Sequence, residues 1–125
     1  MIYYVDGYNL IFHGDYDEEE SLERLRNNCL ENLGPRAKKL SVVVVFDAHN
    51  QEGLLSSIDS SFMEVVFTSH GQSADDYIIE RLQFAKNPTQ CTVVTHDRQL
   101  IKRAREYRAR SLNFQKFFTL LRKKS

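Results

Sequence analysis

The chain has no tryptophan, only two cysteines and two prolines, and no long apolar run. No stretch approaches the roughly 18–20 apolar residues that cross a bilayer, so we expect no membrane association. The first ten residues, MIYYVDGYNL, carry no basic segment and reach Asp6 at once, which is unlike a signal peptide. Cys29 and Cys91 lie far apart without C-x-x-C spacing, which favours buried free thiols in a reducing cytoplasm over a disulfide or a metal site.

Length and composition indicate one globular unit. With 125 residues, the chain is long enough for one domain with a core and too short for two, so we expect a single domain over residues 1–125. Its charges are unevenly distributed: residues 1–34 hold 8 acidic and 2 basic side chains, a net −6, and residues 98–125 hold 10 basic and 1 acidic, a net +9. The basic C-terminal quarter is typical of a polyanion-binding face and equally of a solvated helix face.

Short apolar runs alternate with segments of helical periodicity. We expect strands over 2–6, 41–47, 63–68, 91–95 and 109–112, and helices over 17–33, 73–85, 97–107 and 113–121. Gly34-Pro35 is expected to stop the first long helix, and the Ser-rich segment 50–62 to hold a helical turn and a loop. This alternation predicts an α/β fold: a parallel sheet with helices on both faces. The unbroken apolar run SVVVVF (41–46) is typical of a strand buried on both faces.

Aspartates follow three of the expected strands. Asp6, Asp47 and Asp97 come directly after apolar runs, and Asp75 and Asp76 lie in the first turn of the helix after the third strand. In an open α/β sheet, ligands bind outside the carboxyl ends of the strands. We therefore expect the carboxylates to converge at that end of the sheet.

Such a cluster requires compensation, because two like charges about 4 Å apart repel by roughly 4 kcal/mol at an effective dielectric near 20. One or two Mg²⁺ or Mn²⁺ ions would supply it, since oxygen ligands without a Cys or His cage suit these cations and substrate phosphates complete their coordination. Such ions can generate a hydroxide nucleophile and stabilise the leaving oxygen of a phosphodiester. The cluster therefore predicts a metal site for phosphate chemistry.

Several of these carboxylates also have a structural explanation. One alternative is that Asp97 has no role beyond that of N-cap for the following helix. Asp75 and Asp76 can complement a helix dipole, and Asp76 stands at the capping-box position three residues after a serine, which makes Asp75 the better candidate ligand. For Asp6 no comparable capping gain is evident.

Other polar and aromatic residues flank the aspartates. Asn9 is a candidate for orienting a metal-bound water or a phosphate, or for capping a short turn. His49 and His96 are candidates for contacting a substrate phosphate, or are hydrogen-bond donors around the site. Tyr8 and Phe12 are candidates for stacking on a base, although aromatic residues here more often belong to a core. The basic residues expected to contact the phosphate backbone of a nucleic acid are Arg98, Lys102, Arg103 and Arg105.

Four blocks of the chain, VDGYNLI, VVVVFDAH, VVFTSHGQSADDYIIERL and VVTHDRQLIKRARE, occur in the order and spacing of the NYN domain, in the YacP-like branch of the PIN-like nucleases. The resemblance runs from residue 2 to about residue 121. It implies a Rossmann-like (PIN-like) sheet with strand order 3-2-1-4-5 and metal-dependent endoribonuclease activity. The acids of the family's metal site correspond to Asp6, Asp47, Asp75 and Asp97, with Asn9 beside them. YacP-like proteins usually run longer, so we expect C-terminal surface for substrate or ribosome docking to be missing.

We therefore expect a cytoplasmic, metal-dependent endoribonuclease that acts on single-stranded or ribosome-bound RNA, with mRNA or ribosome-associated RNA as its target. The alternative is a non-catalytic RNA-binding or ribosome-associated module on the same fold, which RNA binding without cleavage under any divalent metal would favour. A phosphotransfer domain with an aspartyl nucleophile is disfavoured. No second Asp stands two residues after Asp6, as it would in a haloacid-dehalogenase-like domain, and the lysine that a receiver-like domain carries at its last strand is absent.

Overall fold

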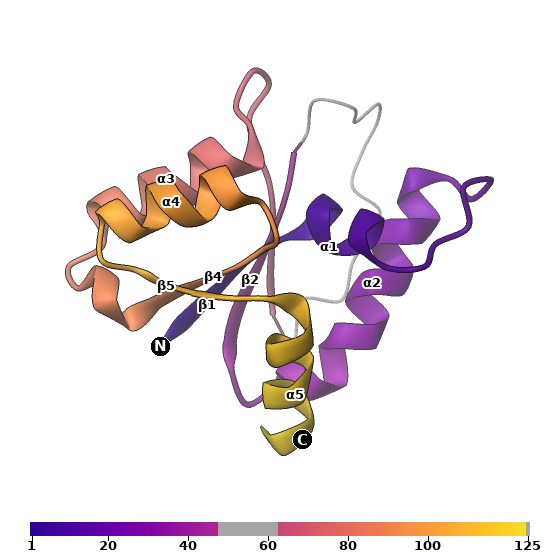
Figure 1. Cartoon of the computed structure of the whole chain (residues 1–125). Coiled ribbons are helices and arrows are strands. Elements are labelled where there is room, and N and C mark those ends of the chain that lie inside the picture. The colour runs from indigo at the N-terminus through magenta and orange to yellow at the C-terminus, as the bar shows by residue number, and fades with distance from the viewer. Residues whose placement is uncertain (48–62, 125) are drawn as a thin grey trace.

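The computed structural model describes residues 1–47 and 63–124, and it contains a five-stranded sheet in which neighbouring strands run parallel. The strands are β1 (Ile2–Asp6), β2 (Ser41–Phe46), β3 (Glu64–Phe67), β4 (Cys91–Val94) and β5 (Arg110–Leu112). Their order across the sheet is β3-β2-β1-β4-β5, which confirms both the parallel sheet and the strand order (Figure 1). Because β1 is central, its last residue Asp6 lies between the ends of β2 and β4.

Helices cover both faces of this sheet, as expected (Figure 1). The helices are α1 (Gly7–His13), α2 (Leu22–Ala37), α3 (Ala74–Phe84), α4 (Arg98–Glu106) and α5 (Phe114–Lys124), with a short 3-10 turn, η2 (Pro88–Gln90), before β4. Helices α1, α2 and α5 contribute to one buried core, and α3 and α4 contribute to a second core on the opposite face. The sheet is thus enclosed between two apolar layers.

Strand β2 shows how the apolar run is used. Val44 and Phe46 belong to the core under α2 and α5, whereas Val45 belongs to the core under α3 and α4. All three side chains are fully buried, which confirms a strand without a polar face. Packing on both faces holds the end of β2 in place, and Asp47 follows directly.

Helix α2 begins and ends later than the sequence indicated. Its N-cap is Ser21, so the acidic residues at 17–20, which the sequence placed in the helix, precede it. The prediction that Gly34-Pro35 stops the helix is wrong, because α2 continues through Pro35 to Ala37. Pro35 is exposed while Gly34 and Ala37 are buried. Packing of the last turn therefore outweighs the one backbone hydrogen bond that the proline removes.

The two cysteines are free thiols, as expected: Cys91 is buried and Cys29 is half-buried. Burial raises the pKa of Cys29 to about 12, so it carries no reactive thiolate at neutral pH. No helix in the described ranges is long and apolar enough to cross a membrane. His49 and the expected turn and loop over 50–62 lie outside the described residues.

Gly7 begins α1 immediately after β1. The absence of a side chain at Gly7 allows a close approach of the chain to β2. A Cβ placed on Gly7 would overlap the ring atoms Cε1 and Cδ1 of Phe46, which is fully buried. The missing side chain therefore lets α1 lie against the end of β2, close to Asp6 and Asp47.

We predict that Gly7→Ala lowers the free energy of unfolding by about 1–3 kcal/mol, because the Phe46 ring must shift within a packed core. The matched control is Gly14→Ala, since a Cβ at Gly14 has nothing within 4 Å. Urea denaturation measures both, and the control is expected to change stability by no more than about 0.5 kcal/mol. Equal effects of the two substitutions would contradict the close-approach explanation.

Candidate functional site

Asp6 is the most buried acid at the carboxyl end of the sheet, with 8% of its surface exposed. Its Oδ2 accepts a hydrogen bond from the Thr95 hydroxyl at 3.2 Å. Burial raises the pKa of Asp6 to about 7, and the negative charges of Asp75 and Asp97 also raise it, against the lowering effect of the Thr95 hydrogen bond. Asp6 is thus a buried carboxyl whose neighbours disfavour its negative charge.

Asp75 and Asp97 form an acidic pair at the same end of the sheet as Asp6. Burial raises the pKa of Asp75 to about 6, followed by the charge of Asp97 and a hydrogen bond between the two side chains, while Arg103 lowers it. Asp97 is also the N-cap of α4, because its Oδ1 accepts from the N–H groups of Gln99 at 2.9 Å and Leu100 at 3.3 Å. Asp97 therefore has the capping role that the sequence allowed and also faces the other acids.

Asp47 completes the arrangement. It follows β2, is half-buried, and lines a hollow of about 390 Å³ together with Asp6 and Asp75. Tyr8 and Phe12 line the same hollow. The structure thus brings acids from the end of β1, the end of β2 and the start of α3 around one open space, with Asp97 beside them.

Asn9 connects α1 to the end of β4. Its Oδ1 accepts a hydrogen bond from the backbone N–H of His96 at 2.8 Å and lies 3.0 Å from the Thr95 hydroxyl. That hydroxyl in turn accepts from the Asp97 N–H at 3.1 Å. Thr95, which is fully buried, therefore links Asp6, Asn9 and Asp97.

Sequence reasoning missed Thr95. The signal that could have revealed it is a hydroxyl residue at the end of a buried strand and two residues before a helix N-cap. A buried hydroxyl needs hydrogen-bond partners, and this position has polar groups on both sides.

His96 is held within the structure. Its Nε2 accepts a hydrogen bond from the Phe114 backbone N–H at 3.0 Å, and its ring stacks on the Phe114 ring with centroids 4.4 Å apart. The His13 ring lies 3.7 Å away, and burial followed by the His13 charge lowers the pKa of His96. These contacts attach β4 to the start of α5.

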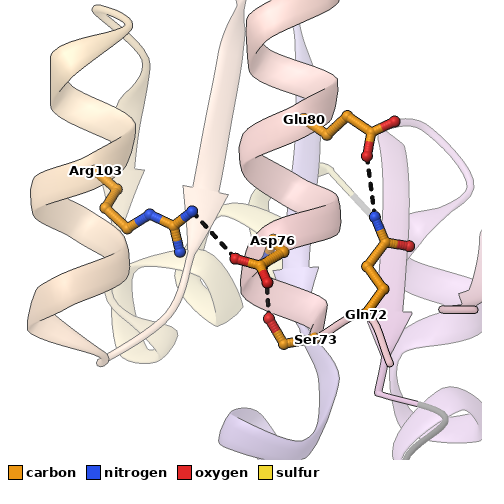
Figure 2. Close-up of polar contacts among 5 residues, drawn as sticks. All are labelled: Gln72, Ser73, Asp76, Glu80 and Arg103. Carbon is orange, nitrogen blue, oxygen red and sulfur yellow. Dashed lines mark hydrogen bonds and ion pairs between the residues drawn. The ribbon is translucent and has the colours of Figure 1, made fainter. Parts of the chain in front are cut away.

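Asp76 is oriented differently from its neighbour Asp75, because successive helical residues point about 100° apart. Its Oδ1 lies 3.2 Å from Nη2 of Arg103 on α4, and its backbone N–H donates to the Ser73 hydroxyl at 3.0 Å (Figure 2). Asp76 thus joins α3 to α4, while Asp75 lines the hollow. Its role as a metal ligand stays a prediction.

The predicted RNA-contact residues on α4 are not equivalent. Arg98, Lys102 and Arg105 are exposed, whereas Arg103 is half-buried and paired with Asp76. Helix α4 begins at the acidic end of the sheet, so Arg98 is its basic residue closest to Asp97. At 1.5 Å per residue, Arg105 lies roughly 10 Å farther along the helix axis.

The carboxylate oxygens of the acids that line the hollow are ligands that suit a hard divalent cation. Among residues 1–47 and 63–124, no group of three His, Cys, Asp or Glu side chains is already assembled around a common metal position. However, the raised pKa values of Asp6 and Asp75 indicate that their negative charge is not fully compensated by the described residues. Mg²⁺ typically takes one or two protein carboxylates and fills its other positions with water and phosphate oxygens, and this site offers carboxylates beside an open space.

Comparisons with known proteins agree with the fold. The family model described as the YacP-like NYN domain matches residues 3–125. The protein YacP of Bacillus subtilis (strain 168) is 33% identical over an alignment of 101 residues, and the match covers 74% of this chain and 58% of that protein. The match thus spans less than two thirds of that relative's length.

Two crystal structures of Rae1 (YacP) from Bacillus subtilis have the same fold. One matches with a TM-score of 0.75 and 26% identity, over 98% of this chain and 74% of that one. The other, of a mutant, matches with a TM-score of 0.71 and 25% identity, over 98% of this chain and 75% of that one.

The acidic cluster predicts an unusual pH dependence of stability in EDTA. The carboxyl groups of Asp6 and Asp75 have higher pKa values in the folded chain than the ordinary 3.8, so the folded state binds more protons than the unfolded state between about pH 4 and pH 7. Their contribution to the free energy of unfolding therefore falls by roughly 2–5 kcal/mol as the pH rises through this range.

Chemical denaturation at a series of pH values measures this slope. Asp6→Asn removes the titrating group and is expected to flatten the slope, whereas Asp15→Asn, an exposed acid outside the hollow, is expected to leave it unchanged. Identical slopes for wild type and Asp6→Asn would contradict the raised pKa of Asp6.

Proposed function

This chain belongs to the family of YacP-like NYN domains, which are nuclease-like and RNA-related, and we propose that it is a metal-dependent endoribonuclease. The observation that carries the proposal is the hollow at the carboxyl end of the sheet, where the buried Asp6 meets Asp47 and Asp75. Ligands of open α/β sheets bind at this end.

We propose Mg²⁺ or Mn²⁺, as one or two ions, as the cofactor. Asp6, Asp47 and Asp75 would hold it, with Asp97 in reach through its pairing with Asp75. When bound, such a cation activates water and stabilises charge on the phosphate and on the leaving oxygen.

The remaining polar residues would fix these carboxylates in place. Thr95 orients Asp6 through its hydroxyl, and the α4 amides hold one oxygen of Asp97. Asn9 keeps α1 attached to the end of β4, so that acids from separate elements keep their spacing. Asn9 would thus support the site through its hydrogen bond to the backbone. Its amide nitrogen is also a candidate donor to a phosphate oxygen.

Helix α4 would bind the RNA backbone. Arg98, Lys102 and Arg105 present exposed positive charges along the helix that starts at the acidic cluster, while Arg103 and His96 are engaged in contacts within the chain. Contacts to phosphate position the RNA without reading its sequence, and they weaken as salt concentration rises.

The proposed substrate is single-stranded or ribosome-bound RNA in the cytoplasm, including mRNA. The alternative is a non-catalytic RNA-binding or ribosome-associated module. One observation favours that alternative: within the described ranges, no three potential ligands are assembled in advance around a metal position. Cleavage assays with Mg²⁺ and Mn²⁺ separate the two functions.

We predict that Asp6→Asn and Asp97→Asn each lower Mn²⁺-dependent RNA cleavage by at least about 100-fold, because asparagine keeps the size of the side chain and removes its charge. Glu31→Gln is the control, since this acid is exposed on α2 and does not line the hollow, and we expect its activity to stay within about threefold of wild type. Gel-based cleavage of labelled RNA, with circular dichroism to verify folding, measures the effects. Full wild-type activity in EDTA would contradict the metal mechanism.

A further inference from the structure

Four aromatic rings form a row from the core to the surface beside the acidic hollow. The ring centroids of Phe46 and Tyr8 lie 5.0 Å apart, those of Tyr8 and Phe12 lie 5.8 Å apart, and those of Phe12 and Tyr16 lie 5.1 Å apart. Phe46 is fully buried, while Phe12 and Tyr16 are 46% and 38% exposed. The row therefore begins in packed core and ends with two rings in contact with solvent.

Phe12 occupies a particular place in this row. It projects from α1 and lines the same hollow as Asp6, Asp47 and Asp75. Exposed single aromatic residues are common, but this one combines an exposed ring with a position at the proposed phosphate site. A nucleotide carries a phosphate and an aromatic base on one sugar, so a substrate held by its phosphate at the acids brings a base near Phe12.

The inner part of the row is held rigidly. Arg26 is only 7% exposed, and its Nη1 donates a hydrogen bond to the Tyr8 hydroxyl at 2.9 Å. The Arg26 guanidinium also lies 5.6 Å from the centre of the Phe67 ring, within the range of a cation–π contact. Tyr8 is thus fixed at both its hydroxyl and its ring, and it supports Phe12 in a nearly parallel stack, at 13° between the planes. A ring supported in this way loses little conformational entropy when a ligand stacks on it.

The surrounding charges favour one course for the RNA. On the side of Tyr16 lies a second hollow of about 540 Å³, lined in part by Asp15, Asp17 and Glu20, which repel a phosphate backbone. On the opposite face of the sheet from α1, α4 offers exposed basic residues beginning with Arg98 (Figure 1). An RNA strand whose backbone runs toward α4 can stack a base on Phe12 while its phosphates stay away from Asp15, Asp17 and Glu20.

We propose that Phe12, flanked by Tyr16, stacks against a base of the nucleotide next to the scissile phosphate, and that Tyr8 and Arg26 position it. The inference rests on the proposed ribonuclease function and adds a binding residue to it. Stacking of bases on aromatic side chains is the usual way in which proteins hold unpaired RNA, and it tolerates any base because each has a π-face. The site is therefore selective for single-stranded RNA.

The test compares the wild type with Phe12→Ala, Phe12→Trp and Phe84→Ala. Phe84 is a matched control because it is 69% exposed and lies at the other end of the sheet, in a hollow that it shares with Met1 and Ile2. Binding is measured by fluorescence anisotropy on a short oligouridylate and on a base-free ribose-phosphate oligomer of equal length, and cleavage of the oligouridylate is measured with Mn²⁺.

We expect Phe12→Ala to weaken oligouridylate binding by about tenfold, and to raise the KM for cleavage more than it lowers kcat. Phe12→Trp is expected to retain binding, and Phe84→Ala to behave as the wild type. On the base-free oligomer, wild type and Phe12→Ala are expected to bind equally, because there is no base to stack.

Cleavage and binding of RNA that are unaffected by Phe12→Ala would overturn the stacking role alone, as would an equal loss on the base-free oligomer. If the wild type neither binds nor cleaves RNA, the proposed function itself fails and the stacking role fails with it.

Discussion

The cost of charging a carboxyl that is buried beside two other acids, at the end of β1, is the constraint on which the rest of this structure depends. Asp6 is buried beside Asp75 and Asp97, and its pKa of about 7 reflects the cost of charging it there. The parallel sheet creates this situation, because central β1 ends between β2 and β4 and brings their following residues together. Two apolar cores hold the strand ends in position, so the acids cannot move apart to relieve the repulsion. A cation bound among these acids would offset the cost.

The side chains around the acids divide into those that face the hollow and those that secure it. Asp75 and Asp76 show this division most clearly, since they are adjacent in sequence, yet one lines the hollow and the other pairs with Arg103. Asp97 serves both purposes, as the N-cap of α4 and as the partner of Asp75. Thr95, directly after β4, links the two groups, because its hydroxyl donates to Asp6 at the end of β1 and accepts from the Asp97 N–H. The acids that line the hollow are thus held in part by hydrogen bonds from residues outside it.

Sequence patterns predicted the strands, their parallel arrangement and the gathering of acids at one end, because each depends on local periodicity and on where an apolar run stops. The resemblance to a known family supplied the strand order. The interior of the site was harder to predict, since the contacts of Thr95 and His96 join residues more than ten positions apart along the chain. Likewise, the end of α2 depended on burial of Ala37, a tertiary effect that overrode the local signal of Gly34-Pro35.

The central claim is that Asp6, Asp47 and Asp75 hold a divalent cation, and anomalous X-ray diffraction from crystals soaked in Mn²⁺ tests it most directly. We predict an anomalous peak in the hollow, with carboxylate oxygens of at least two of these residues as ligands, and loss of that peak in crystals of Asp6→Asn. The absence of any peak among these acids at saturating Mn²⁺, in crystals whose packing leaves the hollow open, would contradict it.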